Sequence, residues 1–399
     1  MDIQKTYYGY KLFKDMIPIY PVYILLFESK GLSLGQISML LAIWSVPAVL
    51  LEVPTGILAD HWNRKNTIII GCLCKAACYI IWLFSEGFAL FALGFLFWGV
   101  SEALCSGSEE ALLYDSLTRN REEDRFDRVY GAGNFFSGLG VALSCFAGGL
   151  LTEAITFHGV LAVSVLMVLL STIFAVCFHE VNDFRTDNED RGPDNSKNAL
   201  ITVKSSLELC FRDKMLLSAI MMLVLAVGVA GILDEYDPLI ADSFDLRPGL
   251  VGVWIGFRYI LEAVGSKTAY QLKALFAKGN IKDPFQVVFA LTVASGACLA
   301  IFGFSHHWMA VPLYGSFYFL MAAAVVLQEE YVQSRIENQG RSTVHSIISL
   351  MYNLYGALFF IAVSAASRIG IHWILVLSGF YMILLCLVIR YLASRIDSR

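Results

Sequence analysis

Long apolar segments follow one another along the chain, and short clusters of charged and turn-forming residues separate them. A helix needs about 20 mostly apolar residues to cross the hydrocarbon core of a bilayer. The pattern predicts twelve such helices, at residues 10–29, 35–59, 67–85, 88–114, 130–152, 158–178, 215–240, 248–272, 284–305, 308–331, 344–367 and 371–392. We therefore expect an all-α, polytopic membrane protein.

Composition supports this interpretation. Hydrophobic residues make up 57% of the chain, charged residues 16%, and the mean hydropathy is +0.64, which leaves too little polar material to coat a soluble globule of 399 residues. The first apolar segment is long, carries Lys11, Lys14 and Asp15, and lacks a small-residue cleavage site, so we expect it to be retained. The small, scattered net charge of -5 argues against a nucleic-acid partner.

The positions of the basic residues predict the orientation. If the amino terminus is inside, most of the 29 Lys and Arg residues fall in cytoplasmic segments, and the outer loops hold only Lys30, Arg247 and Arg368. An even number of crossings then places both termini in the cytoplasm. We expect this topology in a bacterial cytoplasmic (inner) membrane.

The sequence indicates no enzyme chemistry. The nine cysteines are an odd number and lie mostly in apolar segments, and Cys72, Cys74 and Cys78 share no ligand-like helix face. No zinc-ligand spacing, phosphate-binding loop or nucleophile motif is present. We expect no metal, no cofactor and no enzymatic activity.

The predicted helices divide into two sets of six. Residues 179–214 are rich in acidic and turn-forming residues and read as a cytoplasmic linker between an amino-terminal bundle at 1–178 and a carboxy-terminal bundle at 215–399. Trp44 and Glu52 precede Trp254 and Glu262 by 210 residues, and Glu109 and Glu110 precede Glu329 and Glu330 by 220. These offsets favour two pseudo-symmetric halves, although coincidence would give the same spacing.

A glycine-and-charge segment lies between the second and third apolar stretches, with Gly56, Leu58, Ala59, Asp60, Arg64 and Lys65 at fixed spacing. It resembles the loop signature between helices two and three of the major facilitator superfamily, with His61 and Asn63 where that pattern prefers Arg and Gly. The resemblance covers essentially the whole chain and implies the family's fold and its alternating-access mechanism around a central cavity.

The resemblance also implies a gating role for this loop. In the family, residues matching Asp60, Arg64 and Lys65 make contacts that stabilise the outward-open state, and Gly56 belongs to the same signature. Asp115, at the base of helix four, is the expected partner of the basic residues. We therefore predict a conformational gate that comprises Gly56, Asp60, Arg64, Lys65 and Asp115.

Ionisable residues at membrane depth are costly and are candidates for function. Glu102 falls near the middle of helix four, and Glu109 lies seven residues further on the same face, with Ser106 between them. A proton or a cationic substrate is one use for Glu102, and a hydrogen bond to another helix is the alternative. Glu109 and Glu110, with Glu329 and Glu330, either line the inner end of the cavity or pair with Arg335 and Arg128.

Helix eight carries Arg258 and Glu262, four residues apart, so they are expected to pair with each other. If Arg258 were released, it would favour an anionic or zwitterionic substrate. Asp234, Glu235 and Asp237 are predicted to form a solvated outer rim. Lys75 is expected to snorkel or pair.

Uncharged candidates complete the predicted binding site. Tyr23 and Tyr352 are placed to stack on a ring-bearing substrate, and Asn134 and Asn353 to orient a ligand. Helix packing is the alternative role for each of the four.

Together these features predict a secondary transporter that moves a small organic molecule, with proton-coupled export as the favoured mode. The alternatives are proton-coupled or facilitated uptake of a small metabolite, and a non-transporting membrane receptor with the same fold. We expect a monomer in the lipid bilayer whose partners are the small-molecule substrate and protons.

Overall fold

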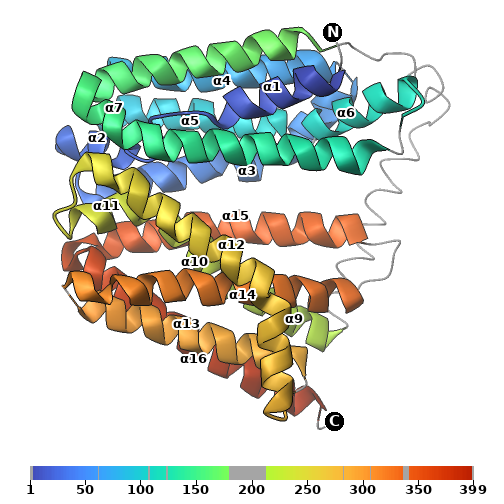
Figure 1. Cartoon of the computed structure of the whole chain (residues 1–399), viewed down its shortest axis with the longest axis vertical. Helices are drawn as coiled ribbons and strands as arrows, with labels where there is room; N and C mark the ends of the chain where they lie inside the picture. Colours follow the sequence, from blue (N-terminus) through green and yellow to red (C-terminus); the bar gives the residue numbers. More distant parts are fainter. Residues whose placement is uncertain are drawn as a thin grey trace. The chain divides into compact units, whose positions relative to one another are not determined.

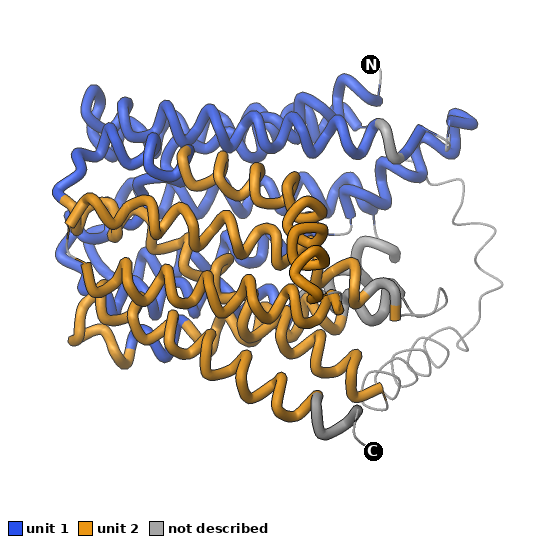
Figure 2. Tube along the Cα trace, turned by 60° about the horizontal axis from the view of Figure 1, so that its bottom comes forward, with its two compact units in different colours: residues 1–190, 245–256, 360–364 blue, residues 191–244, 257–359, 365–399 orange. Residues whose placement is uncertain are grey.

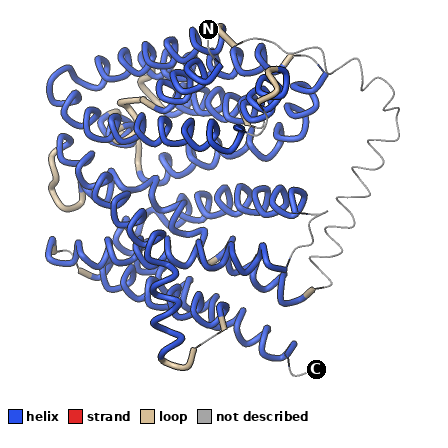
Figure 3. Tube along the Cα trace, turned by 45° about the vertical axis from the view of Figure 1, so that its right-hand side comes forward, coloured by secondary structure: helices blue, strands red, loops and turns tan. Residues whose placement is uncertain are grey.

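A computed structural model describes residues 3–61, 63–106, 108–122, 125–178, 213–281, 283–305, 307–335 and 341–397 of the chain. Side chains are described at these positions except at 52–61, 127–128, 333–334, 341–346 and 394–397. Within these ranges the chain is helical and forms no β-strand (Figure 3). The prediction of an all-α protein is therefore confirmed for the described part of the chain.

The chain forms two compact units (Figure 2). The first comprises Met1–Asp190, Asp245–Gly256 and Phe360–Ser364, and the second comprises Arg191–Phe244, Phe257–Phe359 and Ala365–Arg399. The predicted linker at 179–214 lies outside the described residues except for its last two positions. The division into bundles at 1–178 and 215–399 stays a prediction.

In the described residues of the first unit, seven helices precede the segments that α12 and α15 contribute (Figure 1). Their bounds are α1 (Ile3–Asp15), α2 (Tyr23–Ser29), α3 (Leu34–His61), α4 (Arg64–Leu83), α5 (Phe88–Cys105), α6 (Ser108–Arg119) and α7 (Phe126–Val176). Helix α1 packs on α7, and α5 packs on both α3 and α4. Gly99 permits the approach of α5 to α3, because a Cβ atom there would lie 2.6 Å from the backbone oxygen of Trp44.

The second unit contains the other α-helices of the described residues (Figure 1). They are α9 (Lys214–Leu225), α10 (Ala230–Leu233), α11 (Asp237–Asp242), α12 (Pro248–Lys278), α13 (Pro284–Phe304), α14 (Val311–Arg335), α15 (Arg341–Ala366) and α16 (Ile371–Asp397), with the first residues of α12 and a short part of α15 belonging to the first unit. Helix α13 packs on α14 and α16. Their apolar side chains, with those of α9, form a buried core cluster.

Three predicted helices are interrupted. The segment at 10–29 is divided into α1 and α2, with Pro18 and Pro21 between them, and proline removes one backbone N–H donor at each position. The segment at 88–114 stops at Cys105, because Ser106 adopts an extended ψ of 131°. The segment at 215–240 is a series of short helical pieces that includes Gly228 and Gly231.

Helix α7 contains two of the predicted crossings. At Thr156 the backbone has φ 61° and ψ 169°, which breaks the helix at a single residue, and the chain reverses there (Figure 1). Nine helical segments of the described chain, α7 counted once, are long and apolar enough to cross a membrane. The predicted segments at 10–29 and 248–272 are absent from these nine because the first is interrupted and the second carries Arg258, Glu262 and Lys267.

Candidate functional site

A polar cavity of about 190 Å³ lies in the first unit between α1, α5, α6 and α7. Its wall includes Glu102, Ser106 and Glu109, the three residues that sequence spacing placed on one wet face. The helix break after Cys105 puts Glu102 at the end of α5 and Glu109 at the start of α6. The residues are therefore brought to one cavity, but not by the continuous helix that was predicted.

Glu109 is the most strongly bound carboxylate of this cavity. It is only 7% exposed, and the Tyr10 hydroxyl donates to its Oε1 at 2.8 Å. Lys11 Nζ lies 3.4 Å from Oε2, and Lys14 donates to Oε1. Arg335 and Arg128 were suggested as partners of the predicted glutamates. Arg335 binds Asp213 instead, and the Arg128 side chain lies outside those described.

Glu102 has a partner on the neighbouring helix. Lys75 Nζ of α4 donates to Glu102 Oε1 at 3.1 Å, and Trp98 Nε1 donates to the same atom at 3.1 Å. Lys75 is 3% exposed and lies 5.4 Å from the ring centroids of both Tyr20 and Trp98. The expectation that Lys75 pairs is confirmed by this geometry.

The other candidates of the first unit lie in different surroundings. Glu110 accepts a hydrogen bond from Tyr130 at 2.5 Å, and both residues line the polar cavity. Asn134, one turn along α7, is exposed and is not part of that wall. Tyr23 is buried in an aromatic cluster and does not line the cavity, and its ring neighbours are Phe27, Trp82, Phe95 and Trp98.

The signature segment bridges α3 and α4. Arg64 donates to the Asp115 carboxylate and, at 3.3 Å, to the carbonyl of Ala111, so the predicted contact between α4 and α6 is present. Asn63, which replaces the glycine of the family pattern, caps α4 by accepting from Asn66 N at 2.7 Å. Lys65 follows in the first turn of α4.

The contacts of two members of the predicted gate are not described. Gly56 and Asp60 belong to the last turns of α3, where the structure describes the helix and not the surroundings of its residues. The gating roles of all five residues stay predictions.

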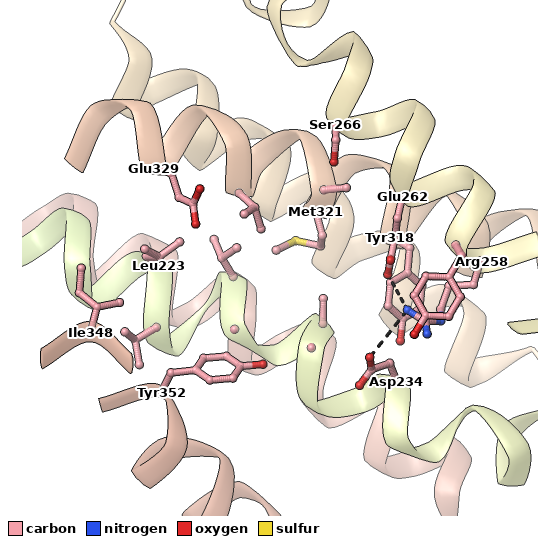
Figure 4. A pocket seen from close by; sticks show the side chains of 18 of the residues that line it. Leu223, Asp234, Arg258, Glu262, Ser266, Tyr318, Met321, Glu329, Ile348 and Tyr352 are labelled. Carbon is pink, nitrogen blue, oxygen red and sulfur yellow. Dashed lines mark hydrogen bonds and ion pairs between the residues drawn. The ribbon is translucent and has the colours of Figure 1, made fainter. Parts of the chain in front are cut away.

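A larger cavity of about 570 Å³ lies in the second unit (Figure 4). Its wall is mostly apolar, and four charged residues interrupt it: Asp234, Arg258, Glu262 and Glu329. The broken stretch α9–α10, with α12, α14 and α15, supplies the wall. A cavity of this size falls in the range of small-molecule binding sites.

Arg258 is the centre of the charged group. Its Nε lies 2.6 Å from Asp237 Oδ2, its Nη1 lies 2.6 Å from Glu262 Oε1, and Nη1 lies 3.8 Å from Asp234 Oδ2. The residue is 4% exposed, and its Cζ lies 4.1 Å from the Tyr259 ring centroid. The predicted pairing of Arg258 with Glu262 is therefore present, and Asp237 adds a second, fully buried partner.

The expected solvated rim is wrong for Asp237 and Asp234. Asp237 is 0% exposed, and besides Arg258 it binds the Tyr314 hydroxyl, which donates to Oδ1 at 2.5 Å. The chain forms short helical pieces here, which the apolar pattern did not reveal. Asp234 lines the cavity.

Only some of the remaining candidates of the second unit line this cavity. Glu329 and Tyr352 line the cavity (Figure 4), while Asn353 does not. Glu330 points elsewhere and binds Lys273 Nζ at 2.9 Å. Gly228 and Gly231 leave room for the Tyr352 ring, whose Cε2 would lie 3.0 Å from a Cβ atom at Gly228.

Sequence analysis missed the roles of Asp237, Tyr314 and Tyr318. Tyr314 and Tyr318 are four apart on α14, and their hydroxyls lie 3.2 Å from each other beside the Arg258 guanidinium. That i, i+4 tyrosine pair in an apolar segment was an available signal. Among the described side chains, no group of three or more His, Cys, Asp or Glu residues is arranged to hold a metal ion.

Comparison with known proteins gives a family match. A family model described as Major Facilitator Superfamily matches residues 12–360. A Bacillus subtilis (strain 168) protein named "Uncharacterized MFS-type transporter YxaM" is 24% identical over 272 residues, which are 68% of this chain and 65% of that protein. The match thus spans slightly less than two thirds of the relative's length.

Solved structures share the fold. A crystal structure of a mutant of the nucleoside transporter NupG matches with a TM-score of 0.78 at 12% identity, covering 98% of this chain and 99% of that chain. A mutant of the peptide transporter POT in complex with alafosfalin matches with a TM-score of 0.63 at 12% identity, covering 99% and 93%. At these identities the likeness concerns the fold alone.

Proposed function

The chain belongs to the major facilitator superfamily, a family of membrane transporters and not of enzymes, and from this premise we propose that it transports a small organic molecule by alternating access. The observation that carries the proposal is the cavity of about 570 Å³ in the second unit, with charged and aromatic side chains on an otherwise apolar wall. Such a wall binds a ligand by burial and orients it with a few polar groups.

We propose twelve crossings in two six-helix bundles. The nine long apolar segments become ten when α7 is divided at Thr156. The interrupted α1–α2 segment and the charged helix α12 supply the other two. In this arrangement both termini are cytoplasmic, and the protein acts as a monomer in a bacterial inner membrane.

We propose that transport is coupled to protons through the polar cavity of the first unit. Glu102 and Glu109 lie there beside Lys75, Lys11 and Lys14, so a change in protonation of either carboxylate breaks or forms an ion pair between two helices. An ion pair that forms in only one protonation state biases a two-state equilibrium. Export by proton antiport stays the prediction for the direction.

Flux measurement tests the proposal. The purified full-length chain is reconstituted into proteoliposomes, a pH gradient is imposed, and uptake or release of radiolabelled metabolites and drugs is compared with that of protein-free vesicles. We expect saturable flux that responds to the gradient. Saturable binding without flux at any gradient would favour the receptor alternative, and flux that is indifferent to pH would remove the proton coupling.

A further inference from the structure

The wall of the second unit's cavity carries more negative than positive groups. Three carboxylates, from Asp234, Glu262 and Glu329, line it with a single guanidinium, that of Arg258. An ionised group at membrane depth costs about 2.5 kcal/mol or more unless a counter-charge or hydrogen bonds compensate it. The wall therefore has room for a further positive charge.

Arg258 is not available to recognise an anion. It is almost fully buried, and Asp237 and Glu262 each bind one of its nitrogens at 2.6 Å. The rings of Tyr259 and Tyr318 cover the guanidinium, with centroids 4.1 and 5.0 Å from Cζ. An anionic ligand would have to displace two close carboxylates, and the remaining wall charges would repel it.

Asp234 is a partly buried carboxylate of this wall whose hydrogen-bonding capacity is not filled. Its Oδ1 is buried and has no hydrogen-bond partner, and its Oδ2 lies 3.8 Å from Arg258 Nη1, beyond hydrogen-bond distance. The side chain is nevertheless 27% exposed and belongs to the cavity wall. Buried carboxylate oxygens normally accept hydrogen bonds, so the Asp234 charge is incompletely compensated, and the exposed part of its side chain gives a ligand's donor access to it from the cavity.

The rest of the wall suits an apolar or ring-bearing body. Aliphatic side chains from α9, α14 and α15 cover most of it. The rings of Tyr318 and Tyr352 line the same cavity as Asp234 (Figure 4). Tyrosine faces attract cations as well as rings. Charge, an unsatisfied acceptor and aromatic surface thus converge in one cavity.

We propose that this cavity binds an organic cation: an ammonium or similar N–H-bearing group donates to Asp234, and an apolar or aromatic body packs against Tyr318, Tyr352 and the aliphatic wall. The inference rests on the proposed transport function, since it names the substrate class of the same site. It replaces the anionic substrate that a released Arg258 would have favoured.

Three probes with one ring system and different head groups test the proposal. Tryptamine carries an ammonium at pH 7, tryptophol a neutral hydroxyl and indole-3-acetate a carboxylate. Binding of each to the purified full-length chain is measured by calorimetry in detergent micelles. We expect tryptamine to bind about tenfold more tightly than tryptophol, and indole-3-acetate more weakly than both.

Two variants locate the effect. Asp234→Asn should lower tryptamine affinity about tenfold and leave tryptophol affinity unchanged, because only the charge-assisted hydrogen bond is lost. Asp242→Asn, an exposed aspartate of the same unit outside the cavity wall, should leave all three affinities unchanged. Since the comparison of probes on the unmodified chain needs no variant, poor folding of Asp234→Asn would not remove the test.

The results that would overturn the proposal are specific. They are equal or tighter binding of indole-3-acetate, absence of binding by all three probes, or an equal loss of all three affinities in Asp234→Asn. Because binding in micelles requires no transport, tryptamine preference without flux would refute the transporter and retain the site. Flux of an anion without amine binding would refute the cation site and retain the transporter.

Discussion

Removing the Asp237 charge is expected to destabilise the second unit strongly. The carboxylate is completely buried, binds Arg258 Nε at 2.6 Å and accepts from Tyr314 at 2.5 Å. Asp237→Asn keeps the shape of the side chain but leaves the guanidinium short of one counter-charge. The asparagine amide has one acceptor oxygen in place of two, so it cannot accept from both Arg258 and Tyr314 through separate oxygens.

The magnitude follows from the geometry. Breaking a buried ion pair by removing one partner costs about 3–5 kcal/mol. Glu262 remains 2.6 Å from Arg258 Nη1, so part of the compensation survives, and we expect a loss of about 2–4 kcal/mol in the free energy of unfolding. The matched control is Glu330→Gln, which removes the partly exposed pair with Lys273 and should cost less than about 1 kcal/mol.

Reversible unfolding by SDS in mixed micelles, followed by tryptophan fluorescence, measures both variants. The double variant Asp237→Asn with Arg258→Gln should lose less than the sum of its single variants, since it leaves no unmatched guanidinium. Equal costs for Asp237→Asn and Glu330→Gln would refute the argument that burial gives this ion pair its weight.

Three further perturbations have expected outcomes. Glu102→Gln should weaken proton-coupled flux in proteoliposomes with normal expression, and an unchanged pH dependence would contradict the proton role. Asp115→Asn removes the partner of Arg64 and should shift the balance between inward- and outward-open conformers, measured by accessibility of introduced cysteines to a membrane-impermeant reagent; an unaltered balance would count against gating. Gly99→Val should cost more than about 2 kcal/mol in SDS unfolding, whereas Gly131→Ala, with open space around it, should cost little; similar losses would argue against close packing at Gly99.

The apolar pattern predicted the helical class and most crossing segments because helix formation in a bilayer depends on local composition. It did not predict the interruptions at 16–22, after Cys105 and at 226–237, since the segments that contain them are mostly hydrophobic. The predicted contact between Arg64 and Asp115 was right, because a signature with known spacing carried it.

Some residues of the candidate site could be predicted from the sequence, and others could not. Glu102, Glu109 and Glu262 were identifiable because a charge in an apolar segment stands out in any sequence. Asp237 was misassigned, because its position along the chain suggested a solvated end of a helix, whereas it pairs with Arg258, 21 residues away in the sequence. The cost of burying a charge indicates that it needs a partner, but it does not identify a partner that is distant in the sequence.

The single-residue reversal at Thr156 has a mechanical consequence. A turn with no connecting loop gives the two legs of α7 no slack, so neither can slide or tilt without carrying the other. The φ of 61° at a β-branched residue also costs free energy that the surrounding packing must offset. We therefore expect the two legs of α7 to move together within the first unit.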